Sequence, residues 1–222
     1  MLKIEKTVTP SPEQWEIVIE GMRNPKNSWG RIDSEAVYCG HYESFDLGEA
    51  DHDLMVRLSN GGSVHAKYRR MLPVWVTLTA PLYWWKEFDT YKVGTVCNSC
   101  STMHKIQAKE FTLDDFSHEH LTHFEQDGEL CRDWLGDLED LIDDLNLARG
   151  LYLLHKDKRY WWQMIQLLPT SYNQKRTIML NYEVLSQMYY WRKNHKLDEW
   201  HTFCEWIESL PYSELITGEG VE

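Results

Sequence analysis

The sequence predicts an α/β protein, because segments that alternate like β-strands are interspersed with segments that are spaced like helices. From Leu72 to Thr79, "LPVWVTLT", every second side chain is apolar, as in a strand with one buried face. Leu185, Met188 and Arg192 follow one another at helical spacings of three and four. The 222 residues are enough to bury a hydrophobic core, and we expect a single domain over residues 1–222.

The charge of the chain is strongly negative and unevenly distributed. The net charge of -12 argues against binding to duplex nucleic acid, which relies on Lys and Arg to neutralise phosphates. Residues 61–105 hold six basic against two acidic residues, whereas residues 106–150 hold three basic against thirteen acidic ones. The first stretch suits a small anionic ligand, and the second is predicted to be a solvated helical face.

The N-terminus and the cysteines favour a cytoplasmic protein. The opening "MLKIEKTVTPSPEQW" lacks the apolar core of a signal peptide, and no apolar run approaches the ~18 residues of a membrane span. The 5 cysteines are irregularly spaced, unlike the disulfide framework of a secreted protein. We therefore expect free thiols, no membrane partner and a cytoplasmic location.

The first part of the chain is predicted to run from strand to helix to loop. "LKIEKTVTP" has the content of a strand, and Ser11 with Pro12 makes a suitable start for a helix over "SPEQWEIVIEGM". The Pro, Asn and Gly residues of "RNPKNSWGRIDS" indicate a loop. Its arginines and Ser34 are available for a ligand, although an ordinary surface loop is the simpler interpretation.

After Thr79 the sequence predicts a tight junction, an aromatic helix and a loop. Pro81 stands where a helix begins without losing a needed N–H, and Trp84, Phe88 and Tyr91 then form one stripe. The periodicity ends at "VGTVCNSCST", where Gly, Asn, Ser and Thr indicate a loop. The amides and hydroxyls of such a loop suit phosphate oxygens.

The rest of the chain is predicted to be mostly helical, with one further strand. From about Thr112 to Leu154 an apolar stripe runs beneath the acidic face, so we expect a helical insertion over about residues 111–156. The stripe consists of Leu135, Leu138, Ile142 and Leu145. "KRTIMLNY" indicates another strand, Asn181 is a good N-cap for "YEVLSQMYYWRK", and "LDEWHTFCEWIESL" is a last helix.

Two groups of potential metal ligands have simpler explanations. Cys97 and Cys100 form a lone Cys-x-x-Cys without the second pair of a structural zinc site, and they follow a helix, whereas a redox pair begins one. His118, His120 and His123 lie in an acidic segment, and on a helix His118 would point away from the other two. We expect no metal, although a histidine-based metal hydrolase stays open as an alternative.

Three polar residues each allow a structural and a functional interpretation. Arg192, near the end of its helix, is either a favourable C-terminal cation or a guanidinium aimed at a carbonyl or phosphate. Asn181 is fully explained as a cap, but it is equally placed for a ligand. His65 is most simply a surface histidine, although the basic "KYRR" beside it favours a ligand.

The order of these segments resembles the flavin-dependent thymidylate synthases of the ThyX family, most of all the divergent branch from phages and gut bacteria. The resemblance rests on "SVHAKYRR", on "PVWVTLTAPLYWWKEFDTYK" with the Ser/Asn loop after it, and on "LLPTSYNQKRTIMLNYEVLSQMYYWRKNHKLDEW". It covers roughly Leu2 to Ser213. It implies a ThyX-like fold with a central mixed sheet flanked by helices.

The family motif Arg-His-Arg corresponds to Thr90, Tyr91 and Lys92, and the final Arg of the motif is absent. As catalytic residues the resemblance implies Arg192, which would polarise the pyrimidine carbonyl, and Ser101, which would hold the phosphate. For the flavin it implies His65, Lys67, Tyr91, Lys92, Asn181 and Gln187. For the nucleotide it implies Glu87, Asn98, Ser99, Ser101, Thr102 and Arg192.

The implied reaction is the reductive methylation of dUMP to dTMP at C5 of the pyrimidine. The resemblance implies FAD as cofactor, NADPH and methylene-tetrahydrofolate as co-substrates, and a homotetramer with FAD between subunits. Two alternatives stay open. The same fold would modify another pyrimidine nucleotide by methylation or hydroxymethylation, or the chain is a non-catalytic homologue that binds flavin or nucleotide.

Overall fold

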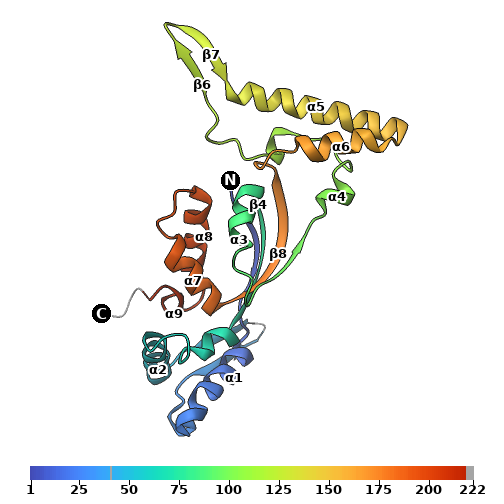
Figure 1. Ribbon diagram of the computed structural model, residues 1–222. Coiled ribbons are helices and arrows are strands. Elements are labelled where there is room, and N and C mark those ends of the chain that lie inside the picture. Colours follow the sequence, from blue (N-terminus) through green and yellow to red (C-terminus); the bar gives the residue numbers. More distant parts are fainter. Residues whose placement is uncertain (41, 219–222) are drawn as a thin grey trace. The chain divides into compact units, whose positions relative to one another are not determined.

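The protein has an α/β architecture, as the sequence predicts (Figure 1). The computed structural model describes residues 1–40 and 42–218, so residues 41 and 219–222 of the predicted domain lie outside the described part. The central sheet has 4 strands in the order β1-β4-β8-β5. These strands are Lys3–Val8, Pro73–Pro81, Asn173–Asn181 and Val96–Ser99, in that order. The sheet therefore joins segments from both ends and the middle of the chain.

The chain divides into two compact units, each built from separate segments. Unit 1 consists of Met1–Lys3, Leu78–Thr90 and Asn98–Arg176. Unit 2 consists of Ile4–Thr77, Tyr91–Cys97 and the described residues from Thr177 onward. Each of the 4 strands of the central sheet passes from one unit to the other along the chain.

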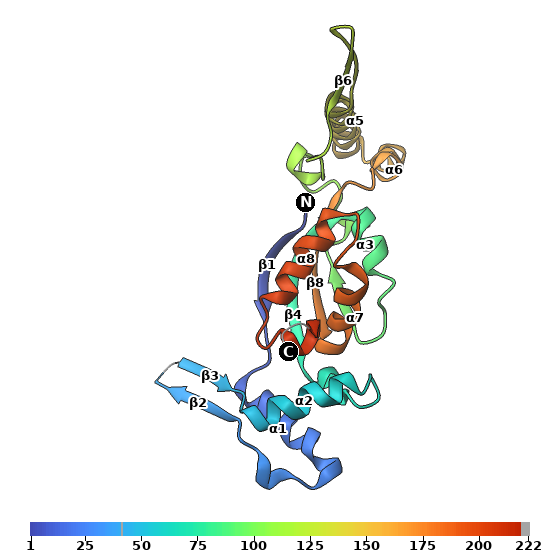
Figure 2. The ribbon, with the colours of Figure 1, turned by 90° about the vertical axis from the view of Figure 1, so that its left-hand side faces the viewer.

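Unit 2 is mainly helical and contains one β-hairpin. Its helices are α1 (Pro12–Arg23), α2 (Glu49–Asn60), α7 (Tyr182–Arg192), α8 (Asp198–Glu208) and α9 (Glu214–Thr217). Helices α7 and α8 pack side by side (Figures 1 and 2), and the hairpin of β2 (Glu35–Cys39) and β3 (Tyr42–Asp46) packs on α1 (Figure 2).

The start of α1 and the core beneath it follow from the sequence. Ser11 and Gln14 form a capping box: Ser11 Oγ accepts from the Gln14 N–H at 3.4 Å, and Gln14 Oε1 accepts from the Ser11 N–H at 2.9 Å. On the inner face of α1, Trp15 contacts Tyr182 and Tyr212, with ring centroids 5.8 and 5.3 Å apart. These aromatic contacts fix α1 to the C-terminal part of unit 2.

Strand β4 confirms the predicted alternation. Leu72, Val74, Val76 and Leu78 are all buried. Helix α3 (Leu82–Phe88) begins one residue later than predicted, because Pro81 is the last strand residue and the N-cap. The prediction that Tyr91 continues the helical stripe was wrong. The helix ends at Phe88, and the Thr90 hydroxyl donates to the Glu87 carbonyl at 2.7 Å in the turn that follows.

The loop predicted after Lys92 contains an edge strand, which is a correction. Strand β5 pairs with β8 in the central sheet, although every one of its side chains is exposed. The backbone N–H of Cys100 donates to the Lys175 carbonyl at 2.9 Å just beyond it. An edge strand needs only its backbone to pair, so its side chains show no buried face in the sequence.

The prediction of a mostly helical stretch from about Thr112 was wrong for its first half. Strands β6 (His123–Gln126) and β7 (Glu129–Asp133) form an antiparallel hairpin in that part of unit 1. Asp127 and Gly128 make its turn with positive φ angles of 53° and 81°. Asp-Gly is a favoured hairpin turn, because both positions need positive φ. All side chains of the two strands are exposed.

The helical part of this segment begins at α5 (Trp134–His155), and α6 (Lys158–Leu167) packs against it. Asp133 caps α5 by accepting from the Gly136 N–H at 3.1 Å. Three residues of the predicted stripe, Leu138, Ile142 and Leu145, are buried, with Phe116 and Met164 in the same core. The stripe was therefore correct for the helix that forms.

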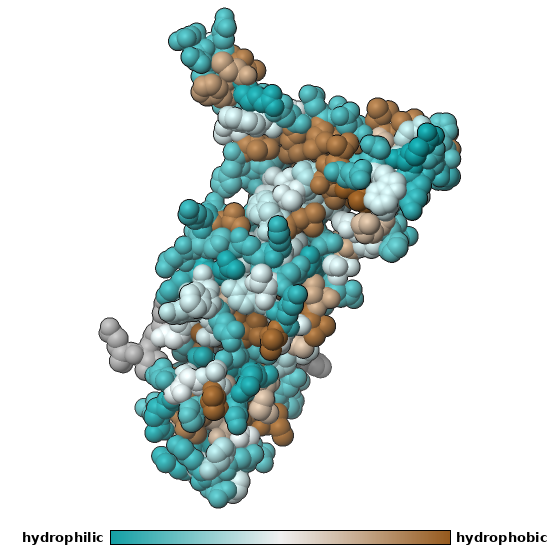
Figure 3. All heavy atoms as spheres, viewed as in Figure 1, coloured by the Kyte–Doolittle hydropathy of each residue, from teal (hydrophilic) through white to brown (hydrophobic). Residues whose placement is uncertain are grey.

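Apolar side chains are also gathered on the outside of α5 and α6 (Figure 3). The exposed large apolar side chains of the two helices are Trp134, Leu147, Leu153, Leu154, Trp162 and Leu167. A cluster of this kind is more typical of an interaction surface than of solvent-facing helices. Among the described residues, no helix combines the length and the apolar character needed to cross a membrane.

Candidate functional site

The last residue of α7, Arg192, lies between two aromatic rings in unit 2. Its Nε donates to the Tyr91 hydroxyl at 3.0 Å. The guanidinium carbon is 4.7 Å from the Trp200 ring centroid and 5.5 Å from that of Tyr91. The two rings meet edge to face, with centroids 6.3 Å apart. We call Tyr91 and Trp200 the aromatic bracket of Arg192.

The bracket is supported from the side by His195. The ring of this residue meets Trp200 edge to face at 6.2 Å. Its Nδ1 accepts from the Leu197 N–H at 3.2 Å, so the neutral ring carries its proton on Nε2. Trp200 is completely buried. The bracket is therefore a packed arrangement, which limits how far the Arg192 side chain can turn.

The segment that carries Tyr91 also approaches the start of α7. Gly94 has φ +80°, and a Cβ there would lie 2.9 Å from Val184 Cγ2 and 3.1 Å from Asn181 Nδ2. Glycine alone tolerates both the backbone conformation and the close approach. Asn181 Oδ1 caps α7 by accepting from the Val184 N–H at 3.0 Å, as predicted. The loop thus contacts α7 near both of its ends.

A buried polar pair lies beside α7 as well. Arg69, in a 3-10 helix at Lys67–Met71, reaches Glu183 on α7 with Nη1 and Oε2 4.0 Å apart, and Nη1 donates to Ser186 Oγ at 3.4 Å. Arg69 Nε and Glu183 Oε2 are buried without a hydrogen-bond partner. Unsatisfied buried polar atoms are costly, and in a native protein they call for an explanation such as a bound ligand.

The other residues assigned to the flavin lie at the surface of unit 2. His65 is in an exposed turn, and Lys67 begins the 3-10 helix that packs on α7. Gln187 is exposed on α7, and Lys92 is exposed next to Tyr91. Asn181 and Gln187 on α7 and the 3-10 helix with Lys67 therefore occupy neighbouring elements.

Unit 1 holds the remaining residues assigned to the nucleotide. Glu87 is half-buried in the last turn of α3, and Asn98 and Ser99 are exposed on β5. Ser101 is exposed and caps the short helix α4 (Thr102–Lys105), its Oγ accepting from the His104 N–H at 3.1 Å. The cap explains Ser101 structurally, and its role in phosphate binding stays a prediction.

Unit 1 also contains a bracketed arginine that sequence reasoning missed. Arg176 lies over the Trp85 ring at 4.2 Å, donates through Nε to Gln174 Oε1 at 2.9 Å, and pairs through Nη1 with Asp89 at 2.7 Å. Trp85 Nε1 in turn donates to the Gln174 carbonyl at 2.9 Å. These contacts fasten the end of α3 to β8. In the sequence Arg176 was only one residue of the strand "KRTIMLNY", so no pattern distinguished it.

The idea that the loop after α1 offers ligand-binding groups was wrong for two of its residues. Arg23 is buried, and its Nε donates to Asp51 Oδ1 at 2.5 Å. The Ser34 hydroxyl donates to Asp51 Oδ2 at 2.8 Å and accepts from the Gly48 N–H at 2.9 Å. Both groups serve to hold the loop on α2.

The candidate metal ligands are not brought together. Cys97 and Cys100 are both exposed. His123 begins strand β6, and His118 and His120 precede it outside any helix, so the helical face that His120 and His123 would have shared does not exist. Within residues 1–40 and 42–218, no three His, Cys, Asp or Glu side chains are placed to hold a metal ion.

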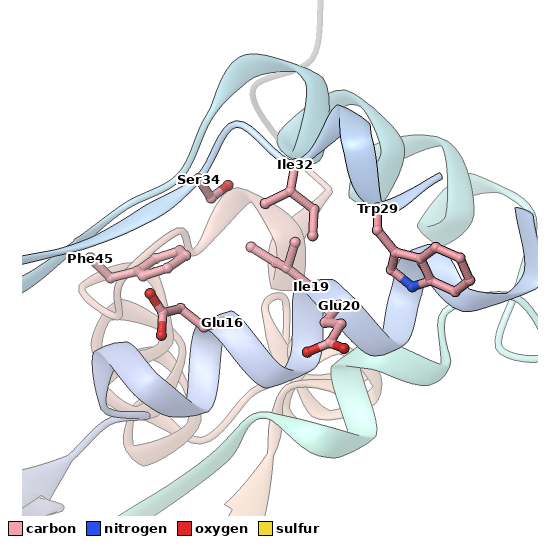
Figure 4. Close-up of a pocket in the computed structure, with 7 residues that line it drawn as sticks. All are labelled: Glu16, Ile19, Glu20, Trp29, Ile32, Ser34 and Phe45. Carbon is pink, nitrogen blue, oxygen red and sulfur yellow. The ribbon is translucent and has the colours of Figure 1, made fainter. Parts of the chain in front are cut away.

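A separate hollow in unit 2 is lined by Ser34 but by none of the residues assigned to the flavin or the nucleotide (Figure 4). Its volume is ≈ 270 Å³. Figure 4 shows Ile19 and Ile32 at its centre, between Phe45 and Trp29, with the Glu16 and Glu20 carboxylates from α1. A hollow with two carboxylates does not suit an anionic nucleotide. The better candidate site is the region around α7, with Arg192, its aromatic bracket and Arg69.

The comparison with known structures decides the fold. A flavin-dependent thymidylate synthase ThyX from Helicobacter pylori, complexed with FAD and dUMP, superposes with a TM-score of 0.63 at 14% identity, over 98% of each chain. A second structure of that enzyme gives 0.64 at 15% identity, over 98% of this chain and 97% of the other. The fold is the ThyX fold.

The ThyX fold extends to a relative with a different description. A UMP/dUMP methylase, PolB from Streptomyces cacaoi, bound with 5-Br dUMP, superposes with a TM-score of 0.57 at 13% identity, over 98% of this chain and 94% of the other. No protein-family model and no curated protein matches the sequence. The sequence resemblance is thus confirmed for the fold, and the ThyX fold covers nearly the whole chain.

Proposed function

We propose that this protein is a flavin-dependent enzyme that modifies C5 of a pyrimidine nucleotide, with the methylation of dUMP to dTMP as its reaction. The observation that carries the proposal is the arrangement around α7. The helix is capped by Asn181 and ends with Arg192, and the loop that replaces the family motif contacts it near both ends. The ThyX fold over nearly the whole chain supports the same conclusion.

The residues beside α7 fit a flavin. Arg69 Nε is a buried donor without a partner, next to the elements that carry Lys67, Asn181 and Gln187. A flavin offers ring carbonyls and phosphates, which are suitable acceptors for a guanidinium. We propose that these residues, with His65, hold FAD. When bound, FAD would supply hydride chemistry, and NADPH and methylene-tetrahydrofolate are the proposed co-substrates.

Arg192 is the proposed contact to the pyrimidine. A guanidinium held between two rings presents fixed donors to a carbonyl oxygen on which negative charge develops. Lys92 would add a mobile positive charge. We assign the phosphate to the hydroxyls and amides of Asn98, Ser99, Ser101 and Thr102, because the family resemblance places it there.

The test is an absorbance spectrum of the purified protein with and without added FAD, followed by assays of turnover on dUMP. We expect a flavin spectrum and loss of turnover in Arg192→Ala. Arg159→Ala is the control, because Arg159 is exposed on α6 and pairs only locally with Asp157. Protein that neither carries FAD nor takes it up would refute the proposal.

A second candidate is the same chemistry on a ribonucleotide, since PolB is described as a UMP/dUMP methylase. Parallel assays on dUMP, UMP and dCMP separate the candidates. Faster turnover of UMP or dCMP than of dUMP would select another substrate. Binding of nucleotide without flavin-dependent oxidation of the folate would indicate a non-catalytic homologue.

A homotetramer is part of the same proposal. The exposed apolar side chains on α5 and α6 support association, because a monomer would leave them in water. Light scattering coupled to size-exclusion chromatography gives the assembly mass directly, to be compared with the 26.5 kDa chain. A monomer at working concentration would rule out the tetramer.

A further inference from the structure

We propose that Tyr91 acts on Arg192 as a positioning residue, with Trp200 as the second wall, and that this bracket sets how tightly the nucleotide is bound. This inference rests on the proposed function, because it assumes that Arg192 meets the nucleotide. The resemblance would place Tyr91 against the flavin instead. In the structure its hydroxyl accepts from Arg192 Nε at 3.0 Å.

The geometry explains how one hydroxyl can orient the whole guanidinium. The guanidinium is planar. The hydrogen bond that its Nε donates to Tyr91, together with the ring contacts at 4.7 and 5.5 Å, therefore fixes both the plane and the rotation of the group. Nε is the donor that Tyr91 takes, so recognition of a ligand carbonyl falls to the Nη groups. A guanidinium that is already oriented loses less conformational entropy when it binds.

The position also explains why tyrosine suits this protein. A tyrosine hydroxyl can accept a hydrogen bond from a guanidinium without changing its protonation state near neutrality, because tyrosine side chains ordinarily ionise only at about pH 10. A histidine accepts through a ring nitrogen only while it is neutral, and its ordinary pKa is ~6.5. Tyr91 therefore makes the orientation of Arg192 independent of pH near neutrality, which a histidine at the same place would not.

The experiment measures dUMP affinity by calorimetry between pH 5.5 and 8.5 for three variants. Tyr91→Phe removes the acceptor but keeps the ring, and we expect about 10-fold weaker binding at every pH, as for the loss of one hydrogen bond to a charged group. Tyr91→His should bind almost like the wild type at pH 8 and weaken below pH 6.5. Tyr190→Phe, at an exposed position of α7, is the control and should change nothing.

A double-mutant cycle with Arg192→Lys shows whether Tyr91 acts through the arginine. If it does, Tyr91→Phe has no further effect once the guanidinium is gone. Equal effects in both backgrounds, or a flat pH profile for Tyr91→His, would overturn the proposal. His195, which contacts Trp200, is present in every variant, so its contribution is common to all the curves that are compared.

A readout without ligand keeps this inference separate from the proposed function. Hydrogen exchange of the Arg192 Nε–H, followed by NMR, should be at least several-fold faster in Tyr91→Phe than in the wild type and in Tyr190→Phe. If the wild type binds no dUMP, the proposed function fails, and the exchange rate still decides whether Tyr91 holds Arg192. An unchanged exchange rate would overturn the bracket itself.

Discussion

Replacing Asp51 with alanine is expected to lower the free energy of unfolding by about 3–5 kcal/mol, because it removes one partner of a buried ion pair and leaves the other partner buried. The carboxylate accepts from Arg23 Nε at 2.5 Å and from the backbone N–H groups of Asp33 and Ser34 at 3.0 and 3.1 Å. It also accepts from the Ser34 hydroxyl at 2.8 Å. The substitution would leave the buried guanidinium of Arg23 without its counter-charge.

This loss is large compared with the total stability of a domain. Ordinary domains have a free energy of unfolding of about 5–15 kcal/mol, so Asp51→Ala would remove a substantial fraction of it. Asp51→Asn keeps an acceptor oxygen but loses the charge, and it should fall between the wild type and Asp51→Ala. Asp53→Ala is the matched control, because Asp53 is exposed on the same helix and should cost under about 0.5 kcal/mol.

The assay is urea unfolding followed by tryptophan fluorescence and circular dichroism. The two signals are compared, because two compact units need not unfold in one transition. If Asp51→Ala loses less than about 1 kcal/mol relative to Asp53→Ala, the ion pair does not stabilise the protein as its geometry suggests. In that case the burial of Arg23 would need another explanation.

Three further predictions follow from single contacts. Gly94→Ala should cost more stability in urea than Gly62→Ala, because both positions have positive φ but only Gly94 would place a Cβ against Val184, and equal losses would refute the clash. Burial, with two neighbouring glutamates, raises the pKa of Cys204 to about 12. The native thiol thus keeps its proton while the unfolded one loses it above about pH 9, so stability should fall by up to about 1.4 kcal/mol per pH unit between pH 9 and 12. Cys204→Ala should flatten this decline, and an unchanged slope would contradict the assignment. Asn181→Ala should cost about 1 kcal/mol and Asn181→Ser much less, unless the cap contributes nothing to α7.

The parts of the fold that the sequence predicted have strong local signals. Ser11 with Pro12 fixed the start of α1, and Asn181 fixed the start of α7. Strand β4 showed its buried face by alternation. The hairpin around Asp127 was missed because both of its strands are solvated, so neither has an apolar face to detect. Its many acidic residues matched a solvated helix equally well.

The candidate site was predictable in its parts but not in its arrangement. Arg192 was identified from its place on α7, and the resemblance supplied Tyr91. The contact between them joins residues 101 positions apart, so no local pattern could show it. The contact of Trp200 with Arg192 could not be predicted from a local pattern either. In the sequence, Arg69 was only one of several neighbouring basic residues. By contrast, Arg23 was predicted to be available for a ligand. Its buried partner Asp51 lies 28 residues away, so no local pattern indicated that the two would pair.

The packing of Trp15 has a consequence during synthesis of the chain. This indole belongs to α1, yet its ring partners Tyr182 and Tyr212 are made much later than α1. At about 5–20 residues per second, a ribosome needs about 10–30 s to reach Tyr182 after Trp15. Throughout that interval Trp15 lacks these two partners and has only Phe45, which stacks on it with ring centroids 5.6 Å apart, among its three ring contacts. Chaperones that bind nascent apolar segments would therefore find a target in this helix.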